Sequence, residues 1–243
     1  SVNIPYFHVI SESKDMTFNP RIYSDNDFII QSEYRQAFEN SNLVADFSFN
    51  NDNNNTNTHT FIDLQGRLNE KSIYHLEFQS VTNDNYLKIH DFTGITDTNI
   101  LMKDIDASML SSYFTVESDI DEDTELSTSI RMYEDLSVKN DNDKYHYIFP
   151  DFTFKKNMEL DESYNGNFLF SSSGYQKNYN TNVYEAQVNN DFEFFSFNSF
   201  TKKGLISNYN FLLKNYNTYS ENSSIFEENS DHELFGTLLL NTE

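Results

Sequence analysis

Residues 43–49, Leu-Val-Ala-Asp-Phe-Ser-Phe, decide the fold class of this chain. In an extended strand, successive side chains point to opposite faces, so alternate residues share a face. Phe47 and Phe49 therefore share one face with Leu43, whereas Asp46 lies on the opposite face. This separation predicts a β-strand that lies between an apolar and a polar environment.

The same alternation recurs along the rest of the chain. The segments that carry it, some more loosely than others, are residues 28–36, 62–68, 74–79, 108–119, 125–138, 145–156, 164–179, 181–200 and 205–219. With the shorter runs, they make roughly a dozen strands, mostly near or above the ~9–11 residues with which a tilted strand crosses a bilayer. Only 6 Gly and 3 Pro interrupt the chain, which favours long strands over a small, turn-rich sandwich.

Composition narrows the function classes. The chain of 243 residues has 39 acidic residues against 16 Lys and Arg, and its formal charge of -23 would repel nucleic acid and anionic headgroups. We therefore expect no nucleic-acid partner. Its 23 Phe and 16 Tyr supply more aromatic surface than a disordered chain carries. Cysteine is absent, which excludes disulfides, and no apolar run is long enough for a transmembrane helix.

Two architectures fit such strands: a soluble sandwich or barrel, and a transmembrane barrel. Aromatic placement favours the second, because transmembrane barrels gather aromatic rings at both bilayer interfaces. Tyr and Phe cluster near the ends of the expected strands, as at Tyr6, Phe28 and Tyr219, although the chain has no Trp. We therefore expect an all-β fold, an antiparallel transmembrane β-barrel that is present as a partial, open sheet.

The alternation also assigns side chains to the two environments of such a barrel. The residues expected to face lipid are Phe47, Phe49, Leu64, Leu76 and Phe78. The polar residues expected to face the lumen are Glu33, Arg35, Asp63, Arg67 and Glu77. Glu33 and Arg35 are separated by about 7 Å along their strand, which predicts an ion-pair network on the lumen side.

No motif in the sequence indicates catalysis. The 6 His residues include no H-E-x-x-H pattern, and Ser171-Ser172-Ser173-Gly174 lacks the G-x-S-x-G form of a nucleophile elbow. His75 and Glu77 share a strand face, and we interpret them as a polar pair in the lumen or in solvent rather than as a site. We therefore expect no enzyme activity, no metal site and no cofactor.

Acidic and Asn-rich tracts separate the strands. Residues 119–123 and 140–143 offer hard oxygen ligands, but neither has the Gly and the terminal Glu of a Ca²⁺ loop. Residues 51–55, Asn-Asp-Asn-Asn-Asn, have the low complexity of a flexible loop. Residues 50–57 and 220–231 are expected to be turns, since polar and Asn-rich segments favour solvated loops.

Three stretches of the first ninety residues carry a resemblance to a known family. Residues 4–23 contain Ile-Pro-Tyr-Phe-His-Val-Ile and then Asp-Met-Thr-Phe-Asn-Pro-Arg-Ile-Tyr, similar to a strand pair "P-Y-Y-W … D-x-T-x-x-P-x-x-Y". Residues 28–38 contain Glu33-Tyr34-Arg35, which matches an "E-[FY]-R" core. Residues 73–92 run through Asn83-Asp84-Asn85-Tyr86-Leu87 to Asp91-Phe92, similar to "S-D-x-x-Y-[FL] … D-F". In this order, the three stretches resemble the early barrel strands of the lipopolysaccharide-assembly family known as LptD or OstA.

The resemblance implies a place and a function. It implies that residues 1–243 are part of a barrel domain in the cell outer membrane, without the periplasmic jellyroll that precedes it and without its last strands. It further implies insertion of lipopolysaccharide into the outer leaflet, with a plug lipoprotein (LptE) inside the barrel and a periplasmic bridge protein (LptA) docked on the missing N-terminal domain. Beyond residue 95, the likeness is only one of alternating strands and polar loops.

Pro5 has two interpretations. Proline removes a ladder donor and occurs at strand starts, edges and bulges, so its position near a strand start requires no function. The resemblance instead implies that Pro5 weakens the strand pairing at a lateral gate through which the lipid leaves the barrel.

Two other functions remain open at the level of the sequence. A general outer-membrane porin or channel would show the same alternation of residues. A secreted or surface-bound soluble β protein acting as an adhesin would also contain many strands.

Overall fold

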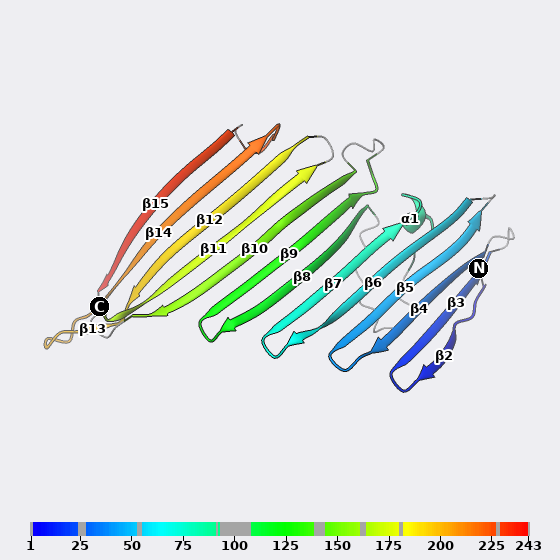
Figure 1. Cartoon of the computed structure of the whole chain (residues 1–243), viewed down its shortest axis with the longest axis horizontal. Helices are drawn as coiled ribbons and strands as arrows, with labels where there is room; N and C mark the ends of the chain where they lie inside the picture. Colours follow the sequence, from blue (N-terminus) through cyan, green and yellow to red (C-terminus); the bar gives the residue numbers. More distant parts are fainter. Residues whose placement is uncertain are drawn as a thin grey trace. The chain divides into compact units, whose positions relative to one another are not determined.

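The computed structural model describes residues 2–23, 28–52, 55–90, 92, 108–138, 144–160, 164–179, 182–226 and 229–242. These residues form antiparallel strands and one short helix (Figure 1). The strands are β1 (Val2–Asn3), β2 (Tyr6–Ser11), β3 (Lys14–Ile22), β4 (Phe28–Ala37), β5 (Ser41–Asp52), β6 (Asn55–Asn69), β7 (Ser72–Val81), β8 (Met109–Asp121), β9 (Thr124–Asp135), β10 (Tyr145–Glu159), β11 (Gly166–Tyr179), β12 (Tyr184–Ser196), β13 (Ser199–Phe200), β14 (Ile206–Glu221) and β15 (Asn229–Thr242). The helix is α1 (Tyr86–His90).

The strands pair in a single sheet that follows chain order almost throughout. Its order is β1, β3 to β12, β14 and β13, with β2 also paired to β3 and β15 also paired to β14 (Figure 1). Among the described strands, β15 pairs with β14 alone, so the sheet of 15 strands is not closed. The prediction of an open, all-β, antiparallel sheet is therefore confirmed. No helix in the described ranges is long and apolar enough to cross a membrane.

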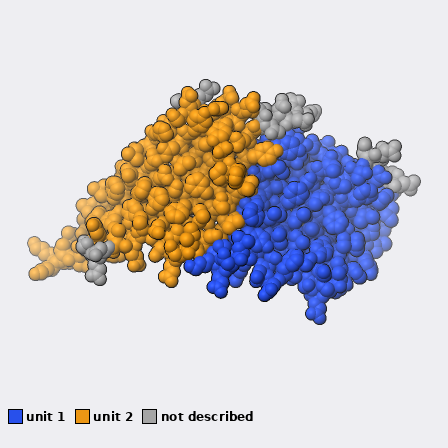
Figure 2. Space-filling view, in the orientation of Figure 1, with its two compact units in different colours: residues 1–115, 131–146 blue, residues 116–130, 147–243 orange. Residues whose placement is uncertain are grey.

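The chain divides into two compact units (Figure 2). Unit 1 comprises residues 1–115 and 131–146, and unit 2 comprises residues 116–130 and 147–243. Strands β8, β9 and β10 therefore contribute residues to both units.

Unit 1 has a small apolar core on one side of its sheet, where α1 packs. Ile29 and Phe61 are fully buried there against Tyr86 of the helix. The other members of this core are Leu87, Phe92, Leu110 and Leu136. The helix was not expected from the sequence. It begins where the Asn83 carbonyl accepts a hydrogen bond from the Tyr86 amide, and two of its five residues are buried.

In unit 2, apolar and polar side chains lie on opposite faces of four paired strands. Phe168, Phe194, Phe211 and Leu238 lie opposite one another in one row through β11, β12, β14 and β15. Because directly paired residues project to the same face, this row belongs to an apolar face. On the other face, the Lys214 Nζ atom lies 3.0 Å from the Asp191 carboxylate.

Two expected turns proved shorter than their polar composition indicated. Strand β5 pairs with β6 as far as Asp52 and Asn55, so most of the tract 51–55, interpreted as a flexible loop, is strand. Likewise β15 begins at Asn229, paired with Ser220, inside the expected turn 220–231. In both places, pairing that is already fixed along a long hairpin extends into polar residues, because ladder hydrogen bonds require no apolar side chain. Residues 53–54 and 140–143 lie outside the described part of the chain.

Gly66 on β6 is a position of close backbone approach. A Cβ atom added at Gly66 would lie 2.7 Å from the Asn40 carbonyl oxygen and 2.6 Å from the Ser41 Cβ atom. The Arg67 amide, one residue later, donates a hydrogen bond of 2.8 Å to the same Asn40 carbonyl. The β5 backbone is therefore held against Gly66.

We predict that Gly66→Ala lowers the free energy of unfolding by about 1–3 kcal/mol, the usual cost of overpacking. Gly236→Ala is the matched control, because its added Cβ would meet only the Leu213 Cδ1 atom, at 3.9 Å. Urea unfolding followed by far-UV circular dichroism measures both. Equal midpoints for the two variants would contradict the close approach at Gly66.

Candidate functional site

The strand register of unit 1 gathers the polar residues predicted for the lumen on one face of the sheet. Arg35 pairs with Val44, Val44 with Asp63, and Asp63 with Glu77, so these residues form one row across β4 to β7. Glu33 lies two residues before Arg35 and therefore projects to the same face. Arg67 follows Asp63 by four residues on β6, and its side chain is exposed.

The residues predicted to contact lipid share the opposite face. Leu64 pairs with Leu76, and Ile62 pairs with Phe78. Phe47 and Phe49 on β5 alternate with buried Asp46 and therefore project to the same side as this apolar row. The two predicted sets thus lie on opposite faces of one sheet, and contact with lipid or lumen stays a prediction.

Exposure is inverted between the two faces. On the apolar face, Phe47, Phe49 and Phe78 are 37–40% exposed. On the polar face, the buried side chains include Gln31, Glu33, Asp46, Ser48 and Asp63, none more than 5% exposed. Water-soluble antiparallel sheets usually show the reverse, with the apolar face packed and the polar face in solvent.

Two ion pairs lie at the edge of the polar face that is formed by β3 and β4. The Arg35 Nε atom lies 2.9 Å from an Asp15 carboxylate oxygen and 3.8 Å from Glu33 Oε1. The expected contact between Glu33 and Arg35 is therefore present. Asp15, which lies opposite Arg35 on β3, is a member that the sequence did not indicate.

A hydrogen-bonded cluster joins the polar face to α1. The His59 ring lies between Asp46 and Ser48, with its Nε2 atom 2.8 Å from Asp46 Oδ1 and its Nδ1 atom 2.7 Å from Ser48 Oγ. Ser48 Oγ also lies 2.9 Å from the Tyr86 hydroxyl. Gln31 Nε2 donates to Asp46 at 3.0 Å. The strands thus present a buried polar anchor to which the helix binds.

Lys144 forms ion pairs with both the segment that follows β7 and strand β9. Its ammonium lies 2.8 Å from an Asp84 carboxylate oxygen and 3.0 Å from Glu134 Oε1. Burial alone would lower the pKa of Lys144, but hydrogen bonds to Asp84 and Glu134 raise the pKa above its ordinary value. A raised pKa contributes stability that is present at neutral pH and is lost only as the pH rises through that raised value.

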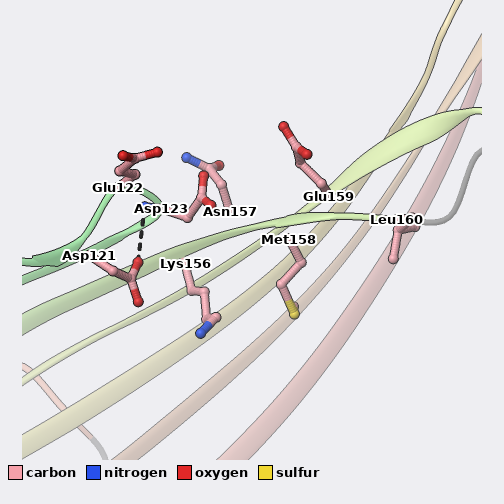
Figure 3. Close-up of a pocket in the computed structure, with 8 residues that line it drawn as sticks. All are labelled: Asp121, Glu122, Asp123, Lys156, Asn157, Met158, Glu159 and Leu160. Carbon is pink, nitrogen blue, oxygen red and sulfur yellow. Dashed lines mark hydrogen bonds between the residues drawn. The ribbon is translucent and has the colours of Figure 1, made fainter.

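The acidic turn at residues 119–123 holds no converging set of ligands. The Asp123 amide donates a hydrogen bond of 3.0 Å to Asp121 Oδ1, which closes the turn between β8 and β9. A hollow of about 580 Å³ beside this turn is lined by Asp121, Glu122, Asp123, Lys156, Asn157, Met158, Glu159 and Leu160 (Figure 3). Figure 3 shows the carboxylates spread around the hollow rather than aimed at one point.

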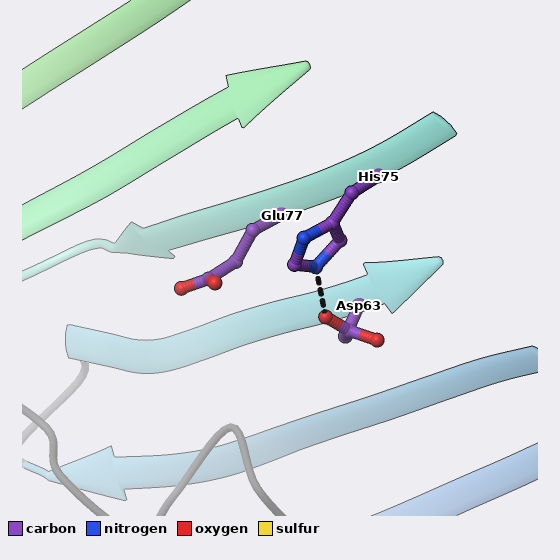
Figure 4. Close-up of side chains that lie close together, drawn as sticks. All are labelled: Asp63, His75 and Glu77. Atoms are coloured by element: carbon purple, nitrogen blue, oxygen red, sulfur yellow. Dashed lines mark hydrogen bonds and ion pairs between the residues drawn. The ribbon is translucent and has the colours of Figure 1, made fainter. Parts of the chain in front are cut away.

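The structure brings together three residues that the sequence did not combine. His75 Nε2 lies 2.6 Å from Asp63 Oδ2, and Glu77 is close to both (Figure 4). Sequence reasoning paired His75 with Glu77 because they are two residues apart on one strand. It missed Asp63, which reaches them from β6.

Pro5 lies in a gap of the edge ladder. Asn3 pairs with Arg21 and Tyr6 pairs with Phe18, so the register is the same on both sides of Ile4 and Pro5. That register places Ile4 opposite Pro20 on β3. Pro5 and Pro20, which both lack an amide hydrogen, thus occur where β1 and β2 are separated. Pro5 comes directly before β2.

No protein-family model matches this chain, and no curated protein matches it.

We predict that Tyr86→Phe weakens the attachment of α1 to the polar face. The variant removes the hydroxyl that meets Ser48, and the loss of such a buried hydrogen bond costs about 1 kcal/mol. Hydrogen exchange at the Ile89 amide, which donates to the Asn85 carbonyl, should quicken about fivefold, the equivalent of that energy. Tyr164→Phe is the control, because Tyr164 is 62% exposed. Unchanged exchange in the Tyr86 variant would show that apolar packing alone holds the helix.

Proposed function

We propose that this chain forms the wall of an outer-membrane β-barrel and that the barrel is a non-enzymatic translocon, which inserts lipopolysaccharide into the outer leaflet. The observation that carries the proposal is the inverted exposure of the two faces, with Phe47, Phe49 and Phe78 outward and Glu33 and Asp46 buried. A bilayer is the medium in which an outward apolar face is stable, and an enclosed polar lumen suits the opposite face.

The lengths of the strands support a membrane-spanning wall. Strands β3, β4 and β7 have 9, 10 and 10 residues, and β5 and β6 are longer. A transmembrane strand tilted by ~45° needs about 9–11 residues. The described strands of unit 1 are therefore long enough to cross a hydrocarbon layer, apart from the short edge strands β1 and β2.

The connections between the strands of unit 1 differ at the two ends of the sheet. At one end, residues 12–13, 38–40 and 70–71 form short turns. At the other end, residues 23–27 and 53–54 are also short connections, but residues 82–108, which join β7 to β8 and include α1, make a much longer one. Outer-membrane barrels have short periplasmic turns and longer extracellular loops, so we assign the end that carries α1 to the cell exterior.

The assignment to lipopolysaccharide rests on the resemblance of residues 4–23, 28–38 and 73–92 to the LptD family. Two features of the fold are compatible with that transport. The polar face has accessible groups for passing sugars at Gln65, Arg67 and the partly exposed Glu77, and the edge ladder has a gap at Pro5. A plug lipoprotein of the LptE kind and a bridge of the LptA kind are the partners proposed with this function.

We predict that a charge scan in lipid vesicles separates the two faces. Leu76→Arg places a cation at the middle of β7 on the apolar face and should cost roughly 2–4 kcal/mol, the usual penalty near a bilayer midplane. Gln65→Arg is the matched control on the polar face, where Gln65 is exposed and lies next to Asp63. Chemical unfolding measures both variants. Equal costs would refute the membrane assignment.

We predict that Pro5→Ala slows lipopolysaccharide delivery in the cells that make the protein. The substitution restores an amide donor to the edge ladder, and one net hydrogen bond of ~0.5–1.5 kcal/mol makes a short strand pairing at the lateral gate harder to open. Sensitivity to large hydrophobic antibiotics reports failed delivery, and protein abundance serves as the control for folding.

Undiminished surface delivery in this variant would show that Pro5 only marks the start of β2. Single-channel recording provides a separate check of the translocon itself. A stable, wide pore that needs no plug would identify a porin instead.

A further inference from the structure

Asp63, His75 and Glu77 form a mixed cluster of metal-ligating side chains on the polar face of unit 1 (Figure 4). One ligand atom from each residue lies within 4.8 Å of those from the other two. Asp63 comes from β6, and the other two come from β7. Among the described residues, this is the only group of three His, Cys, Asp or Glu side chains with such convergence.

The cluster contains an unfavourable arrangement of charge. Asp63 and Glu77 lie directly opposite each other in the ladder, and like charges in that position destabilise the pairing of two strands. Within the described residues, no Lys or Arg forms an ion pair with either carboxylate. Asp15 and Asp191, in contrast, each have an Arg or Lys partner. A bound divalent cation would neutralise the Asp63 and Glu77 pair.

Neighbouring side chains hold each of the three ligands. Gln65 Nε2 donates to Asp63 at 3.2 Å, and Gln79 Nε2 donates to Glu77 at 2.6 Å. The Tyr113 hydroxyl lies 3.2 Å from His75 Nδ1, while the other ring nitrogen faces Asp63. Such outer contacts orient the ligands of metal sites and fix the ring of a ligating histidine.

We propose that Asp63, His75 and Glu77 bind one divalent transition-metal ion of the Zn²⁺ type. One imidazole and two carboxylates suit Zn²⁺ better than Ca²⁺ or Mg²⁺, which prefer oxygen ligands alone. Three protein ligands leave a fourth position for water or for an external oxygen ligand. The site does not depend on the transport function proposed above.

Solvent exposure distinguishes the cluster around His75 from the buried contact between His59 and Asp46. The His75 side chain is 32% exposed, so an ion can reach it from the polar side of the sheet. His59 and Asp46 are 0% exposed, and each of the two His59 ring nitrogens already has a hydrogen-bond partner. The cluster around His75 is therefore the one that an ion can enter without unpacking α1.

The experiment is titration of the whole chain, folded and freed of metal by chelation, with ZnCl₂ in a calorimeter at neutral pH. We expect one Zn²⁺ per chain, with little competition from Mg²⁺. Glu77→Gln and Asp63→Asn keep the size of the side chain and should each weaken this binding at least about tenfold, since even loss of an outer contact costs 10–100-fold. His75→Ala should also abolish the visible absorption of bound Co²⁺.

Asp15→Asn is the matched control. Asp15 ends the same row of the polar face, and the substitution removes the same charge while leaving the three ligands intact. Its affinity for Zn²⁺ should equal that of the natural chain. Circular dichroism confirms folding, and if His75→Ala fails to fold, the isosteric Glu77→Gln decides.

Either of two results would overturn the proposal. The first is a folded natural chain that shows no saturable binding of Zn²⁺. The second is a folded Glu77→Gln variant that binds Zn²⁺ as tightly as the Asp15→Asn control. In both cases the three side chains would be a polar cluster that binds no metal.

Discussion

The cross-strand register of β4 to β7 is the constraint on which both faces of unit 1 depend. Leu64 lies opposite Leu76, while the neighbouring residue Asp63 lies opposite Glu77. Because side chains alternate with a period of two, a slip of one residue would move every apolar side chain of a strand to the polar face. The short turns at residues 38–40 and 70–71 resist such a slip, since loop length sets the pairing of a hairpin.

This register forces charged groups together on the polar face. Glu33 lies opposite Asp46, and both are almost fully buried. Burial of unpartnered carboxylates would cost several kcal/mol each. Here Arg35 lies beside Glu33, and His59 and Gln31 contact Asp46. The polar network is therefore a condition for folding this face.

The sequence predicted which side chains share a face, because alternation is a local property. Phe47 and Asp46 are separated by one peptide bond, and any strand places them on opposite sides. It did not predict α1, which is only five residues long and owes its position to packing of Tyr86 and Leu87 against residues distant in the chain. Residues 51–55 were expected to form a loop because they are polar, but most of them belong to β5 and β6.

The meeting of Asp63 with Glu77 depends on a local irregularity that composition does not reveal. Asn69 lies opposite Ser72, and continuing that register would put Asp63 opposite Phe78. A shift between Arg67 and Asn69 moves the pairing by one residue and brings Asp63 opposite Glu77. A signal for this shift was present, because only the shifted register keeps Leu64 and Leu76 together on the apolar face. Matching faces between neighbouring strands, rather than reading each strand alone, would have shown that Asp63 meets His75 and Glu77.

The two faces together constrain the medium around the sheet. In unit 1 the only helix of the described residues lies on the polar side, so it covers none of the outward Phe side chains. In unit 2 the row of Phe168, Phe194, Phe211 and Leu238 repeats the separation in different strands. Apolar surface left in water costs ~25 cal/mol per Å², and the cost grows with each strand that exposes apolar side chains. A medium that covers that face without a second layer of protein removes this cost, and hydrocarbon is such a medium.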